Sequence, residues 1–183
     1  MRFLWKAYLS WTGWQVIGQY PYQLKKCIVI VGPHTSNWDF VVGVAVRGAL
    51  QLNHIRFLGK KELFKPPYGF FFRWLGGYPV DRSQGQNQVD QVVELFNKNA
   101  EFAIAISPEG TRSRVDRLKT GFYHIAKNAR VPIVMAALDY KNKRVIWSEP
   151  MQPTDDQDND FNTILNFFRP VEGKKPEGGM MHL

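Results

Sequence analysis

Residues 27–39 read Cys-Ile-Val-Ile-Val-Gly-Pro-His-Thr-Ser-Asn-Trp-Asp. The first six form a short apolar run that ends at a glycine, which is typical of a strand buried on both faces. A polar turn follows, and residues 40–50 then carry the apolar periodicity of a helix. Because α/β sheets place reactive groups where a strand leads through a turn into a helix, this stretch predicts both the fold and the position of the site.

The same pattern recurs along the chain. Further short apolar runs are predicted to be buried strands, at residues 103–107, 131–138 and 145–147. Helical stretches alternate with them, at residues 40–50, 62–75, 88–97, 121–128 and 161–168. Since strands that alternate with helices build parallel sheets, we expect an α/β fold with a mostly parallel central sheet flanked by helices.

With 183 residues the chain has the size of a single domain. We expect an amphipathic N-terminal helix over residues 1–22, the main domain over 23–169, and a flexible tail over 170–183 that has turn formers and charges but nothing to bury. Arg2 and Lys6 lie on one side of the predicted N-terminal helix. The apolar set shares the opposite face: Phe3, Leu4, Ala7, Tyr8, Trp11 and Trp14.

Composition limits the classes of partner and compartment. A formal net charge of +8 favours an anionic partner, which includes nucleic acid, a phospholipid surface and phosphorylated substrates. The single cysteine, Cys27, lies in the predicted buried strand, so we expect an inert thiol and a reducing compartment. No apolar run is long enough for a transmembrane helix. The four histidines lack metal-ligand spacing, so no metal site is expected.

His34 and Asp39 are the first candidates for chemistry. Five residues apart, they would point about 140° away from each other on a regular helix. They can meet if His34 lies on the turn and Asp39 in the first helical turn, where the carboxylate would orient the imidazole as a general base. The structural alternative is a capping box with Ser36 as N-cap and Asp39 at N3, and His34 as a turn residue.

Two further segments could bind an anionic substrate. Residues 106–113, which follow a predicted strand, bring Gly110 for close backbone approach and the donors Thr111, Arg112 and Ser113. Residues 76–82 end at Arg82, whose planar guanidinium matches phosphate geometry. The alternatives are an ordinary turn for the first segment and solvated charges for the second.

Taken in order, these segments resemble the glycerolipid acyltransferase family of the lysophosphatidic acid type, which carries an H-x4-D motif. His34, Ser36 and Asp39 match its first block, and residues 77–82 resemble the second. The third and fourth blocks correspond to residues 108–113 and 131–133, and Lys60 aligns with the family's K-x-E-L segment. Pro33 and Ser107 depart from the pattern, where the family usually has Asn and Phe.

The resemblance implies an acyltransferase in which His34, oriented by Asp39, takes the proton from an acceptor hydroxyl that attacks an acyl thioester. The donor would be acyl-CoA or acyl carrier protein, and no further cofactor and no metal are expected. The implied acceptor is most simply 1-acylglycerol 3-phosphate, with another lyso-lipid as the alternative. The implied substrate-binding residues are Ser36, Lys60, Arg82, Glu109, Gly110, Thr111, Arg112 and Ser113. For Glu109 two roles stay open, accepting from a glycerol hydroxyl or positioning the neighbouring arginine.

A lipid acceptor and a water-soluble donor meet at a membrane surface, so the resemblance implies a cytoplasmic protein that is peripheral on the inner face of a membrane. The N-terminal helix suits that interface, although its apolar face could instead pack on the domain's own sheet. The aromatic run at residues 68–75 could likewise line the acyl groove, enter lipid or belong to the core. A nucleic-acid-binding module would also explain the charge, but no such motif occurs, so no nucleic-acid partner is expected. A non-catalytic lipid-binding protein stays an alternative.

Overall fold

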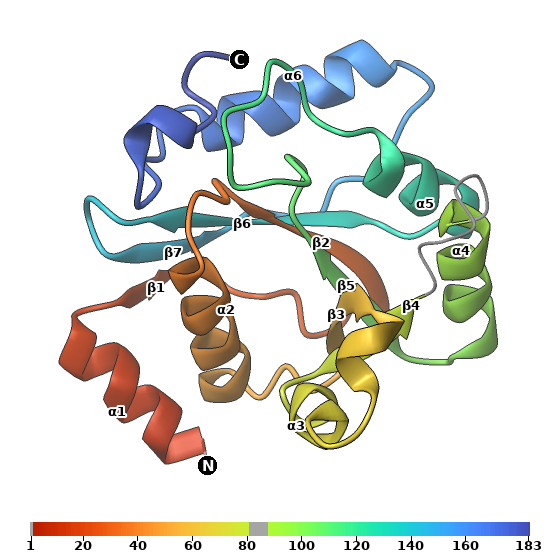
Figure 1. Ribbon diagram of the computed structural model, residues 1–183. Helices are drawn as coiled ribbons and strands as arrows, with labels where there is room; N and C mark the ends of the chain where they lie inside the picture. The colour runs from red at the N-terminus through yellow and green to blue at the C-terminus, as the bar shows by residue number, and fades with distance from the viewer. Residues whose placement is uncertain (1, 81–87) are drawn as a thin grey trace.

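The computed structural model describes residues 2–80 and 88–183, and its centre is a seven-stranded sheet in the order β1-β7-β6-β2-β5-β3-β4 (Figure 1). β6 and β7 run antiparallel, and the other neighbouring strands run parallel. The mostly parallel α/β fold predicted from the sequence is therefore confirmed. The strands are β1 (Gln15–Ile17), β2 (Lys26–Gly32), β3 (Ile55–Lys60), β4 (Gly77–Val80), β5 (Phe102–Ile106), β6 (Ile133–Asp139) and β7 (Arg144–Trp147).

Helices cover both faces of this sheet (Figure 1). The helices of the described residues are α1 (Arg2–Thr12), α2 (Trp38–Ala49), η1 (Lys61–Phe64), α3 (Gly69–Trp74), α4 (Gln88–Lys98), α5 (Gly121–Ala129), α6 (Gln157–Phe168) and η3 (Pro176–Gly178). Alternate residues of β2 point to opposite faces. Ile28 and Ile30 pack with α4, α5 and α6, whereas Cys27 and Val29 pack with α1 and α2. The apolar run therefore fills two cores at once.

The predicted helix over residues 62–75 is interrupted. η1 ends at Phe64, and α3 begins only at Gly69. Pro66 and Pro67 lie between them, and each lacks the N–H that a continuous helix would need. The break turns α3 outward, and Phe70 and Trp74 are exposed.

The N-terminal helix is shorter than predicted. α1 ends at Thr12, and Gly13 turns the chain with a positive φ of 78° before β1 begins. The inward side packs against α2 through Leu9, which is buried. Phe3 and Trp11 face outward with 80% and 86% of their surface exposed. The helix therefore packs on the domain with one side and presents aromatic residues on the other, and no helix of the described residues is long and apolar enough to cross a membrane.

The C-terminal segment corrects an expectation. Residues 170–183 were expected to have nothing to bury, yet Met180 is fully buried in the core beside Phe168. A side chain at Gly32 would collide with Met180, so β2 and the C-terminal segment pack tightly. Lys175 N–H also donates to Thr35 Oγ1 at 3.1 Å. The segment therefore supports the turn that follows β2.

Candidate active site

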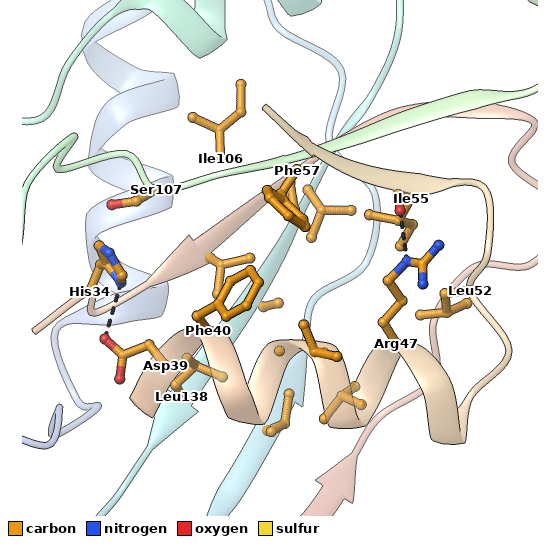
Figure 2. Close-up of a pocket in the computed structure, with 18 of the residues that line it drawn as sticks. His34, Asp39, Phe40, Arg47, Leu52, Ile55, Phe57, Ile106, Ser107 and Leu138 are labelled. Carbon is orange, nitrogen blue, oxygen red and sulfur yellow. Dashed lines mark hydrogen bonds and ion pairs between the residues drawn. The ribbon is translucent and has the colours of Figure 1, made fainter. Parts of the chain in front are cut away.

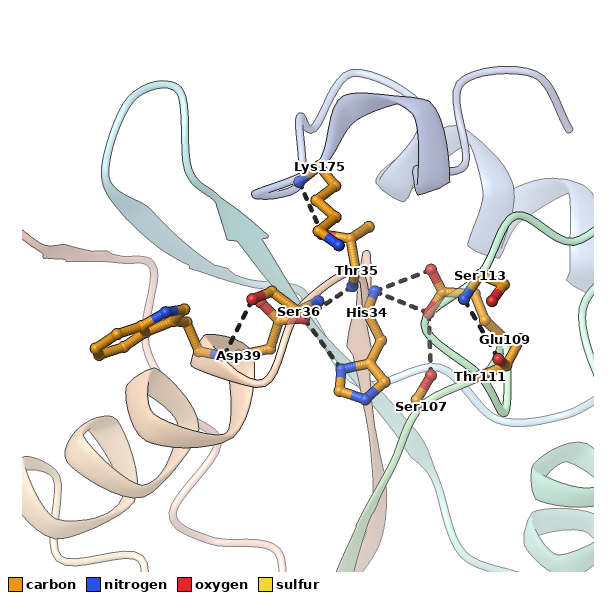
Figure 3. A network of polar contacts seen from close by, with 10 residues as sticks. His34, Thr35, Ser36, Asp39, Ser107, Glu109, Thr111, Ser113 and Lys175 are labelled. Carbon is orange, nitrogen blue, oxygen red and sulfur yellow. Dashed lines mark hydrogen bonds and ion pairs between the residues drawn. The ribbon is translucent and has the colours of Figure 1, made fainter.

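The site lies where the loops after β2 and β5 meet. These strands are parallel neighbours, and Ile30 pairs with Ile106 in their register. The residues that follow each strand therefore emerge at the same edge of the sheet, which is where α/β folds place ligands. Figure 3 shows the result, with His34 between Asp39 on one side and Glu109 on the other.

The histidine and aspartate predicted to meet do so. His34 Nδ1 lies 3.1 Å from Asp39 Oδ2, with His34 on the turn and Asp39 in the first turn of α2 (Figure 3). The same oxygen accepts the N–H groups of Thr35 and Ser36, each at 2.8 Å. These bonds fix the carboxylate, which in turn fixes the ring and leaves His34 Nε2 as the nitrogen that faces away.

The predicted capping box, with Ser36 as N-cap and Asp39 at N3, does not form as predicted, because Ser36 Oγ bonds Trp38 and not the N–H of Asp39. Ser36 Oγ accepts the N–H of Trp38 at 3.2 Å, and Ser36 N–H donates to Asp39. This reciprocal pair stabilises the start of α2, although the cap position itself is Asn37, whose side chain makes no capping bond. The Asp39 carboxylate therefore accepts hydrogen bonds from the turn that leads into α2 and also orients His34.

Burial and hydrogen bonding act in opposite directions on Asp39, which is only 3% exposed. Burial alone would raise its pKa, but the hydrogen bonds from His34 and Ser36 outweigh burial and lower the pKa below its ordinary value. Tyr140 also lowers it, although neither Tyr140 Oη nor Asp39 Oδ1 has a hydrogen bond of normal geometry within the described residues. Asp39 is therefore held ionised.

Glu109 has a role that the sequence did not indicate. Its carboxylate accepts the backbone N–H of His34 at 2.9 and 3.0 Å, and it accepts Ser107 Oγ–H at 3.0 Å (Figure 3). The residue is 1% exposed, and burial raises its pKa despite the bonds from His34 and Ser107. Glu109 thus holds the histidine's backbone, and within the described residues it makes no hydrogen bond or ion pair with the neighbouring Arg112; the contact with a glycerol hydroxyl stays a prediction. The two residues lie 75 positions apart, so no local pattern could have joined them.

The remaining predicted residues divide into four groups. Gly110, Thr111 and Arg112 line an open cavity of about 640 Å³ that His34 also borders, together with Lys119. Ser36 and Ser113 lie nearby on the two loops (Figure 3), whereas Lys60 is exposed at the end of β3 and lines neither of the cavities at His34. Arg82 lies outside the described residues.

A second cavity begins at the same histidine. It has about 250 Å³ and runs between α2 and the sheet, from His34 and Asp39 to Arg47 (Figure 2). Its walls are almost wholly apolar and include Phe40, Phe57 and Leu138. His34 therefore stands between an apolar cavity and a cavity with basic residues, an arrangement suited to a molecule that joins an acyl chain to a phosphate.

No group of three or more potential metal ligands occurs among the described residues. The contacts at His34 suit proton transfer by its imidazole, with Asp39 fixing its ring and Glu109 its backbone.

Comparison with known proteins adds an independent observation. A family model described as Acyltransferase matches residues 14–139. The 1-acyl-sn-glycerol-3-phosphate acyltransferases of Saccharomyces cerevisiae, Haemophilus influenzae and Escherichia coli are 30%, 31% and 28% identical over 60%, 58% and 64% of the chain. The chain spans less than half of each relative, at 38%, 45% and 49%.

The fold also matches a solved structure. The crystal structure of the 1-acyl-sn-glycerophosphate acyltransferase PlsC from Thermotoga maritima superposes with a TM-score of 0.62, and the match covers 91% of this chain and 74% of that one. The sequence identity is 18%.

Proposed function

Given that the chain belongs to the acyltransferase family, we propose that it transfers a fatty acyl group from a thioester to the free hydroxyl of 1-acylglycerol 3-phosphate, which yields phosphatidic acid. The observation that carries this proposal is the place of His34, which is held by Asp39 and Glu109 at the junction of the two cavities. The names of the related proteins support the choice of acceptor.

In the proposed reaction, His34 Nε2 removes the proton of the acceptor hydroxyl as the oxygen attacks the thioester carbonyl. The new C–O bond forms, the C–S bond breaks, and the proton passes from His34 to the leaving thiolate. Asp39 stays ionised and stabilises the transient imidazolium through Nδ1. A thioester is already activated, so general-base assistance of about 10²–10⁴-fold together with positioning supplies the acceleration.

The two cavities divide the substrates by polarity. The acyl chain of the donor occupies the apolar cavity between α2 and the sheet, with its carbonyl carbon at His34. The acceptor phosphate occupies the larger cavity, where Arg112 and Lys119 supply positive charge and Gly110, with a φ of 69°, lets the backbone approach closely. The phosphates of CoA or of acyl carrier protein suit the same basic surroundings.

A bilayer supplies the acceptor, so the protein works as a peripheral protein on the inner face of a membrane. Exposed aromatic residues on α1 and α3 support this placement, because aromatic side chains bind at the level of the lipid headgroups.

The test is acyl transfer by purified protein in mixed micelles that contain 1-acylglycerol 3-phosphate, with acyl-CoA and acyl carrier protein offered separately and products identified by mass spectrometry. Phosphatidic acid formed by the wild type and lost by at least about 10²-fold in His34→Ala supports the proposal. Equal product from both proteins would overturn the mechanism. If product formed only with another lyso-lipid, the proposed acceptor would be wrong. Folded protein that acylates no lipid would favour a non-catalytic lipid-binding role.

A further inference from the structure

A third cavity lies at the end of α2 away from His34. It has about 440 Å³, and three arginines line it, Arg2 from α1, Arg47 from α2 and Arg56 from β3. Asp39 and Gly48 stand about 14 Å apart along the helix at the usual rise per residue, so this cavity and the dyad occupy opposite ends of α2. It shares no lining residue with the cavity that contains Arg112, and it adjoins the far end of the apolar cavity, with which it shares Val44, Arg47 and Leu75.

The positive charge of this cavity is not balanced. No acidic residue is among the described residues that line it. Within the described chain, no hydrogen bond or ion pair engages the side chain of Arg56, and Arg2 donates only Nε, to the carbonyl of Ala49 at 3.3 Å. Arg47 is used structurally, because its side chain donates to the carbonyls of Ile55 and Asn53. Two guanidinium groups therefore remain able to bind an anion.

Apolar groups flank these arginines. Trp5 of α1 and Trp74 of α3 both line the cavity, so the two helices border it from different sides. Figure 1 shows α1 and α3 at the same end of the molecule, below the sheet. Elsewhere on their surfaces, α1 exposes Phe3 and Leu4, and α3 exposes Phe70 and Phe71. A basic centre between exposed aromatic helices is complementary to lipid headgroups above an apolar layer.

We propose that the cavity lined by Arg2, Arg47 and Arg56 binds the phosphate of an anionic membrane lipid and thereby anchors this end of the molecule. The lipid is a docking partner and not the substrate, since the cavity lies away from His34. A soluble phosphate would have the same charge, but it would make no use of the exposed aromatic residues on both sides.

The experiment measures co-sedimentation with vesicles of phosphatidylcholine alone and of phosphatidylcholine that contains phosphatidic acid. All variants are made in the His34→Ala background, so that lipid turnover does not affect binding and the outcome is independent of the proposed reaction. The test variant is Arg2→Gln with Arg56→Gln, which leaves Arg47 and its structural bonds in place. The matched control is Lys127→Gln with Arg144→Gln, which removes two positive charges from exposed positions outside this cavity.

We expect the test variant to lose about tenfold or more of its affinity for the phosphatidic acid vesicles, with little change on phosphatidylcholine alone. The control should lose only a small part of that affinity. A variant with Arg2→Lys and Arg56→Lys should restore most of the binding, which separates loss of charge from a folding defect. Equal losses in test and control variants would overturn the proposal in favour of diffuse electrostatic attraction. If inorganic phosphate displaced the protein from the vesicles as well as added phosphatidic acid did, the assignment of a lipid as the ligand of this cavity would be overturned.

Discussion

At the scale of single residues, the site depends on two buried carboxylates with different tasks. Asp39 contacts the imidazole ring of His34, and Glu109 holds its backbone N–H. The pKa of Asp39 lies below its ordinary value, and that of Glu109 lies above it. Hydrogen bonding to the ionised form prevails in Asp39, whereas burial prevails in Glu109. As the pH rises, ionisation of Asp39 should therefore stabilise the folded state, whereas ionisation of Glu109 should destabilise it.

For Asp39, a lowered native pKa means that the ionised carboxylate stabilises the folded state. This contribution is complete above the unfolded carboxyl pKa of about 3.9 and is lost as the pH falls through the native pKa. Asp39→Asn removes it. Thermal unfolding of both proteins should show a wild-type advantage that is constant above about pH 5 and shrinks below about pH 4. An advantage that grows on acidification would contradict the role assigned to the Asp39 bonds.

For Glu109, two substitutions separate charge from hydrogen bonding. Glu109→Ala leaves the buried His34 N–H without its acceptor and should cost about 1–3 kcal/mol in the free energy of unfolding. Glu109→Gln keeps an acceptor and removes a buried charge. This variant should therefore lack the loss of stability that the wild type shows as the pH rises through the raised Glu109 pKa.

Kinetics then distinguish the two assignments of Glu109. A positioning residue that supports His34 should lower kcat in Glu109→Ala with little change in KM for the acceptor, and Glu109→Gln, which keeps the acceptor for the His34 N–H, should retain most of kcat. A rise in KM for the acceptor with kcat unchanged would instead mean that Glu109 contacts the substrate, as the family resemblance implies.

At the scale of elements, α2 carries Asp39 in its first turn, and it has two glycines that face different surroundings. A Cβ at Gly43 would meet nothing within 4 Å, because this position faces the apolar cavity. A Cβ at Gly48 would collide with the Trp5 ring of α1. The same substitution in one helix should therefore have opposite effects.

Gly43→Ala should stabilise the protein by about 0.5–1 kcal/mol, because alanine loses less backbone entropy in a helix. Gly48→Ala should destabilise it by about 1–3 kcal/mol, since Trp5 must move and α1 packs less well on α2. Urea unfolding measures both changes. Equal stabilisation of the two variants would show that the contact between α1 and α2 is too loose to constrain Gly48.

The elements themselves were predictable to different degrees. β2 was evident from Cys27 to Gly32 because it is apolar on both faces, and the first helix after it followed from its periodicity. β1 lies inside the range predicted as the N-terminal helix, and β3 was not identified because Arg56 interrupts its apolar character. The expectation for the tail was wrong because no local sequence pattern indicates a buried Met180, whose place depends on its packing against the distant Gly32.

At the scale of the whole molecule, contacts between residues far apart in the sequence fix positions that local sequence patterns do not indicate. His34 and Asp39 could be paired from the sequence because a turn-to-helix geometry requires only their spacing. The bond between His34 and Glu109 depends on the register of β2 with β5, which only the folded sheet fixes. The arginine cavity likewise joins α1, which ends at Thr12, to α2 and β3, which begin at Trp38 and Ile55.

The exposed aromatic residues of α1 should contribute the apolar part of membrane binding, which neutral vesicles measure separately from the electrostatic part. Phe3 and Trp11 are 80% and 86% exposed, so Phe3→Ala with Trp11→Ala should leave the thermal stability nearly unchanged. Each aromatic side chain can bury about 150–250 Å² at about 25 cal/mol per Å², so the double variant should bind neutral phosphatidylcholine vesicles at least about tenfold more weakly. Leu9→Ala, on the packed side of α1, should instead lower stability. Unchanged binding to neutral vesicles by the folded Phe3 and Trp11 variant would show that α1 does not enter the lipid.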